Sequence, residues 1–344
     1  MTILGIESSC DETAAAVVSD GRELLSNVIE SQIDLHAVYG GVVPEIASRS
    51  HLEAVVPVVK DAMQQADTDW SDIDAIAVTN GPGLSGSLLI GTMTARTLAW
   101  LHNKPLYGVN HVLAHVYANF LHQRQPQFPM LALIVSGGHT QLVLFKNHFD
   151  YELLGQTRDD AVGEAFDKVA KMLGLAYPGG PSVAAAAIDG KTDSFKLPKL
   201  NQNKLDKYSF SFSGLKTAVL RALQSHIGED YNFPSHRLSE RLSERDKANM
   251  AASFQETAVS HLVDKLQAAE VEFSPASIVI AGGVAANQRL RELITERVAT
   301  SVDYVPAQLC TDNAAMVAAL AYYQSLHIEP NDLHQLAVNS SLAM

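Results

Sequence analysis

The chain has 344 residues, of which 47 % are hydrophobic and 18 % are charged. It is too long for one ordinary domain, and its composition is that of a folded protein, so wholesale disorder is excluded. The net charge of -13 opposes a polyanion, so a role with nucleic acid needs a local basic patch or a basic partner.

The cysteines and the N-terminal residues predict the compartment. Cys10 and Cys310 are the two cysteines of the chain, which excludes a disulfide framework and predicts a reducing, cytoplasmic location. No apolar run approaches the roughly 18 residues of a membrane helix. Residues 1–11 have neither a basic flank nor a cleavage site, so we expect a first strand there rather than a signal peptide.

The first half of the chain predicts alternating strands and helices. Residues 2–20 have the pattern of a hairpin, with Ser8-Ser9-Cys10-Asp11 as its turn. Further strands are expected at 24–29, 73–78 and 105–109, and helices from Pro44, from Ser87 and over 111–121. The helix from Pro44 is expected to kink at Pro57 and to bury the apolar positions that recur at helical spacing, namely Leu52, Val55, Val56, Val59 and Met63.

The second half begins at about Pro129 and predicts a similar alternation. We expect strands at 130–135, 140–145 and 278–281, a long helix over 246–266 and a last helix from Asn313. Asp159 is predicted to cap a helix that ends at Gly174. Residues 191–212 are expected to be irregular, 225–247 to be a flexible insertion, and the tail beyond Glu329 shows no clear pattern.

Two segments of the first half of the chain each resemble a segment of the second half, and the two resemblances occur in the same order. Residues 3–18 and 131–145 each consist of a strand, a turn of small residues, a threonine and a second strand. Residues 73–83 and 278–283 each consist of a strand and a glycine-rich turn, and both lead into a helix. This internal symmetry indicates a duplicated α/β unit.

The two hairpin turns are candidates for phosphate binding. Ser8, Ser9, Ser136, Gly137 and Gly138 leave backbone N–H groups accessible to an anion. Small residues in a tight hairpin are the commoner explanation for either turn alone, but their occurrence twice favours a nucleotide phosphate held between two domains. Neither a P-loop nor a Rossmann glycine motif is present.

Two histidines form a candidate metal site. His111 and His115 stand four residues apart on a predicted helix, so they share a face and can bind one ion. Asp312 is a candidate third ligand, although it could equally cap the helix that follows. The zinc-protease motif has glutamate directly after its first histidine, where this chain has Val112, so peptidase chemistry lacks its base. Two surface or partly buried histidines remain the plainer alternative.

Other polar residues carry less information by themselves. Glu7, Asp11 and Glu12 cluster at the first turn, where they would repel a phosphate unless a metal or a proton intervenes. Asp167 alone would be a solvated charge, and Asn287 alone is unremarkable. Both cysteines are expected to be small buried residues rather than nucleophiles.

Many long motifs occur in one order over about residues 2–325. They are Gly5-Ile6-Glu7-Ser8-Ser9-Cys10-Asp11-Glu12-Thr13, Gly40-Gly41-Val42-Val43-Pro44-Glu45, Gly81-Pro82-Gly83-Leu84, the segment from His111 to His115, Val135-Ser136-Gly137-Gly138-His139-Thr140, Gly163-Glu164-Ala165-Phe166-Asp167-Lys168, Tyr177-Pro178-Gly179-Gly180-Pro181, Phe210-Ser211-Phe212-Ser213-Gly214-Leu215-Lys216-Thr217, Gly282-Gly283-Val284-Ala285-Ala286-Asn287 and Cys310-Thr311-Asp312-Asn313. With these motifs the chain resembles the bacterial TsaD family of tRNA N6-adenosine threonylcarbamoyltransferases.

The resemblance implies the two-domain, duplicated α/β fold of actin, Hsp70 and sugar kinases (the ASKHA fold). The first domain would comprise residues 1–126 and the second 127–312. A helix over 313–326 would pack back on the first domain, and 327–344 would be a tail. The implied activity transfers threonylcarbamoyl from threonylcarbamoyl-AMP to N6 of the adenosine 3′ of the anticodon, in tRNAs that read codons beginning with A, and releases AMP.

The resemblance also implies roles for particular residues. His111, His115 and Asp312 would bind one divalent transition metal, Fe²⁺ in preference to Zn²⁺. The candidate catalytic residues are Asp11, Glu12 and His139, with Asp11 or Glu12 as our hypothesised proton acceptor. The contacts to nucleotide and substrate would come from Ile134, Val135, Ser136, Gly137, Gly138, Asp167, Gly180 and Asn287.

The implied partners are tRNA, the degenerate paralogous subunit TsaB and the small ATPase TsaE. The basic segments Lys196 to Lys207, which includes Lys204, and Arg237 to Lys247 could contribute to a composite tRNA surface, or be solvated loops. The chain departs from the family at Ala184, where many members have an acidic residue, in the insertion 226–247 and in its tail.

Three other functions remain open from the residues alone. A small-molecule kinase of the same fold would leave the histidine pair idle. A non-catalytic scaffold conflicts with the intact set of His111, His115 and Asp312. A metallopeptidase lacks its base at Val112.

Overall fold

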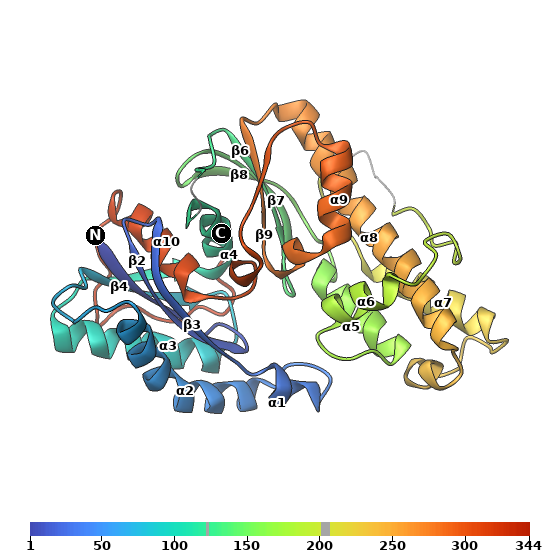
Figure 1. Cartoon of the computed structure of the whole chain (residues 1–344), viewed down its shortest axis with the longest axis horizontal. Coiled ribbons are helices and arrows are strands. Elements are labelled where there is room, and N and C mark those ends of the chain that lie inside the picture. The colour runs from blue at the N-terminus through green and yellow to red at the C-terminus, as the bar shows by residue number, and fades with distance from the viewer. Residues whose placement is uncertain (122–123, 201–206) are drawn as a thin grey trace. The chain divides into compact units, whose positions relative to one another are not determined.

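The computed structural model describes residues 1–121, 124–200 and 207–344, so Lys204 lies outside the described residues. The chain divides into two units (Figure 1). The first unit consists of Met1–Pro126 together with Val305–Met344, and the second of Gln127–Tyr304. The first cut lies where the sequence analysis placed it. The return to the first unit begins at Val305, whereas the sequence analysis extended the second domain to residue 312.

A five-stranded sheet forms the core of the first unit. Its order is β3-β2-β1-β4-β5, with bounds β1 Thr2–Glu7, β2 Glu12–Ser19, β3 Glu23–Ser31, β4 Ala75–Gly81 and β5 Leu106–Asn110. β1, β2 and β3 pair antiparallel, and β4 and β5 continue the sheet in parallel. The predicted hairpin is confirmed, because Ile3 pairs with Val18 and Glu7 with Ala14.

Helices cover this sheet. They are α1 Ile33–Ala37, α2 Pro44–Gln65, α3 Ser85–His102, α4 His111–Tyr117 and α10 Ala314–Ser325, with short 3-10 helices at Ala118–Leu121 and Ala307–Leu309. α2 and α3 pack on each other, and α10 packs on β1, β2 and α4 (Figure 1). The tail is also attached to this unit, since Asn331 N donates to Leu106 O at 2.8 Å and Asn339 N to Asn80 O at 2.8 Å.

The second unit repeats this arrangement. Its sheet has the order β10-β9-β6-β7-β8, with bounds β6 Met130–Val135, β7 Thr140–Asn147, β8 Asp150–Gln156, β9 Ser277–Ala281 and β10 Val302–Tyr304. Its helices are α5 Val162–Leu173, α6 Gly179–Ala187, α7 Ser213–His226, α8 Glu244–Phe273 and α9 Gln288–Arg297, with 3-10 helices at Ser235–Glu240 and Gly283–Ala286.

The two sheets share one topology. In each, three consecutive strands pair antiparallel, and the first of the three, β1 or β6, pairs in parallel with a later strand. That later strand, β4 or β9, then pairs in parallel with the last one. The duplication predicted from the sequence is therefore a property of the fold.

Some local predictions were wrong. Leu52 and Val56 were expected in the core, but their side chains are 64 % and 68 % exposed, because α2 faces the sheet with Val55 and Val59 instead. Asp159 does not cap α5, whose N-cap is Ala161. Its carboxylate instead accepts hydrogen bonds from the backbone of Phe212 and Ser213. The carboxylate of Asp159 therefore bonds a segment far away in the sequence rather than the N-terminus of α5.

Several elements were missing from the sequence analysis. Strands β8 and β10 and helices α6 and α7 lie where loops or no element had been predicted. The long helix α8 is longer than predicted at both ends, since a capping box at Ser243 starts it at Glu244 and it continues to Phe273. The end of α5 was predicted correctly, since Gly174 is its C-cap with φ 68°. Among the described residues, no helix combines the length and the apolar character that crossing a membrane requires.

Candidate active site

Three side chains from distant segments converge in the first unit. α4 starts immediately after β5, with Asn110 as its N-cap, and places His111 and His115 on one face. Asp312 comes from the segment before α10. The cap of α10 is Asn313, whose side chain accepts a hydrogen bond from Met316 N, so the alternative role of Asp312 as an N-cap does not hold.

The geometry of these three residues would allow them to hold one metal ion. One ligand atom from each lies within 4.8 Å of the others. Oδ1 of Asp312 is 3.6 Å from Nε2 of His111 and 3.2 Å from Nε2 of His115. Two imidazoles and one carboxylate leave coordination positions open for substrate oxygens, which suits non-haem Fe²⁺ or catalytic Zn²⁺.

Glu7, the last residue of β1, bonds the imidazole of His111 through its carboxylate. Its side chain is fully buried, and its Oε2 lies 3.2 Å from Nδ1 of His111 and accepts a 2.5 Å hydrogen bond from Thr79. Ser9 contributes a further contact, with Oγ 3.1 Å from the same Nδ1. Because an ionised carboxylate only accepts hydrogen bonds, Nδ1 of His111 carries its hydrogen and Nε2 is left for a metal.

His115 supplies the test of whether a metal fits. Its side chain is buried, and within the described residues neither of its ring nitrogens has a hydrogen-bond partner. Buried polar atoms are normally paired, so an orphaned imidazole beside a carboxylate needs an explanation. A metal ion bound by His111, His115 and Asp312 supplies it, and these residues fit a divalent transition metal.

The charges around His111 are strongly coupled. Burial lowers the pKa of His111, but the carboxylates of Asp312 and Glu7 outweigh burial and raise it to about 9. For Glu7 burial raises the pKa, and the charge of His111 and its hydrogen bond bring it below its usual value. A bound cation replaces the proton that these carboxylates otherwise hold on His111.

The two candidate proton acceptors lie at the turn between β1 and β2. Burial first, and then the charge of Asp312, raises the pKa of Asp11. Burial together with the charges of Asp11 and Asp312 raises the pKa of Glu12 to about 8, against a 2.9 Å hydrogen bond from Ser31 Oγ. Burial also raises the pKa of Cys10, so its thiol is not an activated nucleophile.

The second unit has an open turn between β6 and β7. Ser136 N donates to His139 O at 2.8 Å, and His139 N donates to Ser136 Oγ at 3.1 Å, which closes the turn. Gly137 and Gly138 are exposed, and a Cβ added to either would meet no atom within 4 Å. Their backbone is therefore accessible to an anion.

Glycines beneath this turn let its neighbours approach closely. A Cβ on Gly163, in α5, would lie 2.6 Å from Ser136 O, and one on Gly282, after β9, would lie 2.5 Å from Val135 O. The turn is thereby packed against the start of α5 and the end of β9. The turn is therefore open on one side and closely packed on the other.

The first turn is unsuited to phosphate, against the sequence analysis. Ser9 N donates to Oε1 of Glu7 at 2.6 Å, and Ser8 Oγ donates to Ser87 O at 2.9 Å. Both groups are therefore used within the fold, and three carboxylates lie in or beside this turn. We conclude that the two equivalent turns do not share one ligand chemistry.

The other residues of the second unit that were predicted to contact nucleotide or substrate take part in the packing of this unit or lie on its surface. Oδ1 of Asp167 accepts a 2.7 Å hydrogen bond from Gly179 N, which joins α5 to α6 beside Gly180. Asn287 caps α9 and donates to Gln255 at 2.9 Å. Ile134 and Val135 are fully buried in β6, so only their backbone could contact a ligand. A Cβ on Gly180 would meet nothing within 4 Å.

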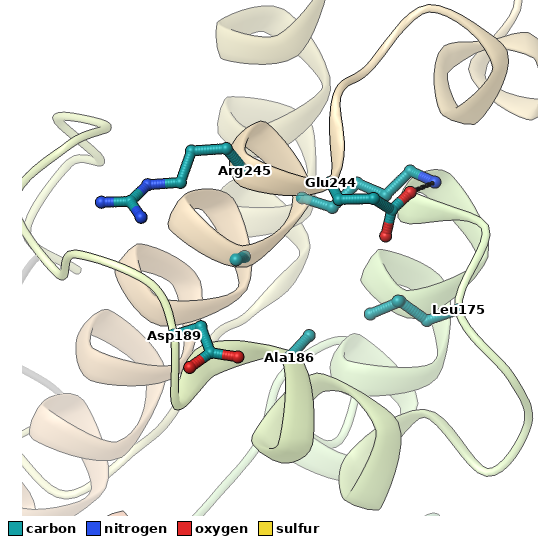
Figure 2. A pocket seen from close by; sticks show the side chains of 7 residues that line it. Leu175, Ala186, Asp189, Glu244 and Arg245 are labelled. Carbon is teal, nitrogen blue, oxygen red and sulfur yellow. Dashed lines mark hydrogen bonds and ion pairs between the residues drawn. The ribbon is translucent and has the colours of Figure 1, made fainter.

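A separate cavity of about 300 Å³ in the second unit contains none of these residues. It lies between the end of α6, with Ala186 and Asp189, and the start of α8, with Glu244 and Arg245 (Figure 2). Glu244 is engaged by Lys247 at 2.7 Å. Charges of both signs line this cavity without converging on one point, so it is not a candidate for the active site.

Sequence reasoning missed the role of Glu7, which it noted only as one of three acidic residues. A charged residue that ends an otherwise apolar strand was the available signal, since such a side chain is buried only when it is paired. The partner itself, His111, is more than a hundred positions away.

Fold and site together define a protein with two α/β units of one topology and with two histidines and one carboxylate grouped as a candidate metal site. The structure is similar to that of component A of (R)-2-hydroxyglutaryl-CoA dehydratase of Acidaminococcus fermentans, with a TM-score of 0.54, 13 % identity and 95 % and 99 % of the two chains covered. At this identity the likeness concerns the fold.

Sequence comparisons identify the family. The family profile described as TsaD, tRNA N6-adenosine threonylcarbamoyltransferase, matches residues 23–319. The enzyme of that name from Thermomicrobium roseum is 52 % identical over 336 residues, covering 94 % of this chain and 92 % of the relative. The one from Symbiobacterium thermophilum is 51 % identical over 324 residues, covering 93 % and 91 %. The chain belongs to the TsaD family of tRNA N6-adenosine threonylcarbamoyltransferases and is a transferase.

Proposed function

We propose that this enzyme transfers the threonylcarbamoyl group from threonylcarbamoyl-AMP to N6 of the adenosine 3′ of the anticodon, in tRNAs that read codons beginning with A. The N6 amine forms a bond to the carbamoyl carbon, the bond from that carbon to the phosphate oxygen breaks, and AMP leaves. Membership of the family, over most of the chain, is the observation that carries this proposal.

The first unit supplies the electrophilic side of the reaction. His111, His115 and Asp312 would hold one divalent metal ion per chain, Fe²⁺ in preference to Zn²⁺, which as a Lewis acid would stabilise negative charge on the carbamoyl oxygen. Glu7 orients His111. Asp11 or Glu12 accepts the proton that the attacking amine loses. Since the exocyclic amine of adenine is a weak nucleophile, positioning contributes more than base strength.

The second unit supplies the nucleotide side. The turn from Ser136 to Gly138 holds the adenylate phosphate through the exposed backbone of Gly137 and Gly138, with Asp167, Gly180 and Asn287 as further contacts. His139 closes the same turn through its backbone, and we keep it as a third candidate catalytic residue. The accessible glycines support this assignment, because a phosphate needs N–H groups that no side chain covers.

An exposed apolar strip on the first unit supports a complex with the paralogous subunit. Leu52 and Val56 on α2 and Leu89 and Met93 on α3 are all between 45 % and 68 % exposed. A Cβ on Gly86 would lie 2.3 Å from Ser48 Oγ, so the two helices meet one turn before this strip. Surface side chains of this kind that adjoin on two packed helices are typical of an interface.

Charge replacements test that interface. Val56→Asp and Met93→Asp in one chain should abolish co-elution with the paralogous subunit in size-exclusion chromatography. Val271→Asp on α8, at a residue that is 77 % exposed in the second unit, is the matched control and should leave the complex intact. Co-elution of the double variant would exclude this strip as the docking site.

The basic segments support a composite tRNA surface rather than strong binding by this chain alone. Arg237, Arg241 and Lys207 pair with Glu240, Glu229 and Glu272, which neutralises much of their charge. We expect the paralogous subunit and the ATPase TsaE to tighten tRNA binding and to steepen its dependence on salt. Replacing Lys199 and Lys204 with Glu should weaken tRNA binding and leave adenylate affinity intact.

Mass analysis of tRNA nucleosides after depletion of this protein tests the function directly. N6-threonylcarbamoyladenosine should disappear, and it should return with the wild-type chain but not with His111→Ala. The exposed histidine variant His334→Ala is the matched control and should restore the nucleoside. Unchanged nucleoside after depletion would contradict the proposed function.

A further inference from the structure

His51 on α2 is fully buried and has a hydrogen-bond partner for each ring nitrogen. Nδ1 lies 2.7 Å from Oγ1 of Thr13, and Nε2 lies 3.0 Å from the carbonyl oxygen of Cys10. A carbonyl only accepts, so Nε2 carries the hydrogen, and the hydroxyl of Thr13 donates to Nδ1. Burial lowers the pKa of His51, in agreement with this neutral tautomer.

The two partners of His51 bracket the acidic turn. Cys10 directly precedes Asp11, and Thr13 directly follows Glu12, so His51 holds the backbone on one side of the two carboxylates and a side chain on the other. The carbonyl of Cys10 belongs to the peptide plane from which Asp11 emerges. Its orientation therefore sets the direction of the Asp11 side chain.

This turn needs such a clamp because its own charges repel. After burial, the charge of Asp312 raises the pKa of Asp11, and the charges of Asp11 and Asp312 raise the pKa of Glu12. Oε2 of Glu12 is buried without a hydrogen-bond partner in the described part of the chain. Ser87 Oγ adds a longer 3.4 Å contact to the same carbonyl of Cys10. Of these two contacts, the one to His51 is the shorter.

We infer that His51 is a positioning residue, which fixes Asp11 and Glu12 in place for proton transfer by bridging the carbonyl of Cys10 and the hydroxyl of Thr13. Its two ring nitrogens bond Thr13 and Cys10, neither of which is a metal ligand, so we expect metal loading to survive its replacement. The catalytic consequence rests on the proposed function, but the clamp itself does not.

The thiol of Cys10 reports the clamp without any assay of activity. In the metal-loaded chain, iodoacetamide should label Cys10 at least ~10-fold faster in His51→Leu than in the wild type, since two buried groups lose their partner. Buried Cys310 in the same unit is the internal reference and should not change. Val55→Ala, one turn along α2 and in the core, is the matched control. It should change the labelling rates of Cys10 and Cys310 only as far as it lowers the stability of the fold.

Steady-state transfer in the complete system with tRNA and partners tests the consequence. His51→Leu should lower kcat on the order of 100-fold, as expected for a misplaced acceptor, with one metal per chain and an unchanged KM for tRNA. His51→Gln should recover most of kcat, because its amide carries one donor and one acceptor, whereas Val55→Ala should keep kcat.

The outcomes separate the inference from the proposed function. Cys10 labelling that stays at the wild-type rate in His51→Leu overturns the clamp, and raised labelling with kcat within about twofold of the wild type overturns its catalytic role. If kcat of His51→Gln falls as far as that of His51→Leu, the hydrogen bonds are not the cause. A wild-type complex that forms no threonylcarbamoyladenosine contradicts the proposed function and leaves the clamp to the labelling result.

Discussion

The turns after β1 and after β6 occupy equivalent positions in two sheets of identical topology, yet their surroundings are opposite. The first turn is enclosed, with Glu7 and Ser9 in its interior and His51 of α2 beneath it. The second is open, with Gly137 and Gly138 exposed and no atom near the place of an added Cβ. Duplication therefore preserved the backbone and let side chains diverge.

This difference supports the proposal that the two turns serve different chemistry. An enclosed turn lined by carboxylates can orient a metal ligand and hold a proton, but it repels phosphate. An open turn with exposed glycines offers N–H groups to an anion and brings no carboxylate close to it. Two halves of one fold can thus serve a metal and a nucleotide separately.

The largest expected effect is on the metal. His111→Ala removes one of two histidine ligands, so metal per purified chain should fall from one to nearly none, and transfer should fall to background. His334→Ala should retain the metal. Elemental analysis of both proteins measures this, and unchanged stoichiometry in His111→Ala would sink the assignment.

The raised pKa of Glu12 in the first turn predicts that the free energy of unfolding depends on pH. Glu12 has a pKa of about 8 in the folded chain and near 4.5 when unfolded, so the folded state holds the proton over this window. The contribution of Glu12 to the free energy of unfolding of the metal-free protein should therefore fall as pH rises from 5 to 8, by roughly 3 to 4 kcal/mol at most, at about 1.36 kcal/mol per pKa unit.

Glu12→Gln should make that dependence shallower, most clearly between pH 5 and 6.5, because its side chain does not titrate, whereas the fall contributed by His111 above pH 6.5 should remain. Urea denaturation at pH 5, 6, 7 and 8 measures it for both proteins. An equally steep fall in the variant would mean that Glu12 is not the group responsible.

Support of His111 by Glu7 is expected to matter less than the ligand itself. Glu7→Gln keeps the size of the side chain but removes the carboxylate that fixes the tautomer of His111. Metal affinity should fall by about 10- to 100-fold, the usual effect of losing such a partner. Competition with a chelator measures it, and wild-type affinity would show that the contact of Ser9 with Nδ1 suffices to orient the ring.

The open turn of the second unit is expected to be sensitive to bulk alone. Gly137→Val introduces a branched side chain where the structure has free space, so the protein should fold but bind AMP at least ~30-fold more weakly, roughly 2 kcal/mol for buried polar groups left unpaired. Gly214→Val, at another glycine with free space in the same unit, is the control. Equal AMP affinity of the two variants would refute the placement.

Much of the fold was predictable because its signals are local. The hairpin at residues 2–20, the repeat of that hairpin at 131–145 and the end of α5 at Gly174 each depend on residues within one or two turns of chain. Short elements with weak patterns, such as β10 and α6, escaped, since their stability comes from neighbours in space. Leu52 and Val56 follow helical spacing, but the spacing does not say which side of α2 the sheet covers.

The residues of the candidate site also separate into those that local sequence predicts and those that only the fold brings together. Sequence alone determined that His111 and His115 share a face, because spacing of four residues sets this in any α-helix. Only the tertiary structure decided that Asp312 completes the set rather than capping α10, that Glu7 lies behind His111 and that His51 brackets the acidic turn. These pairs are separated by tens to hundreds of residues, and they meet only in the folded first unit, where burial makes an unpaired charge costly.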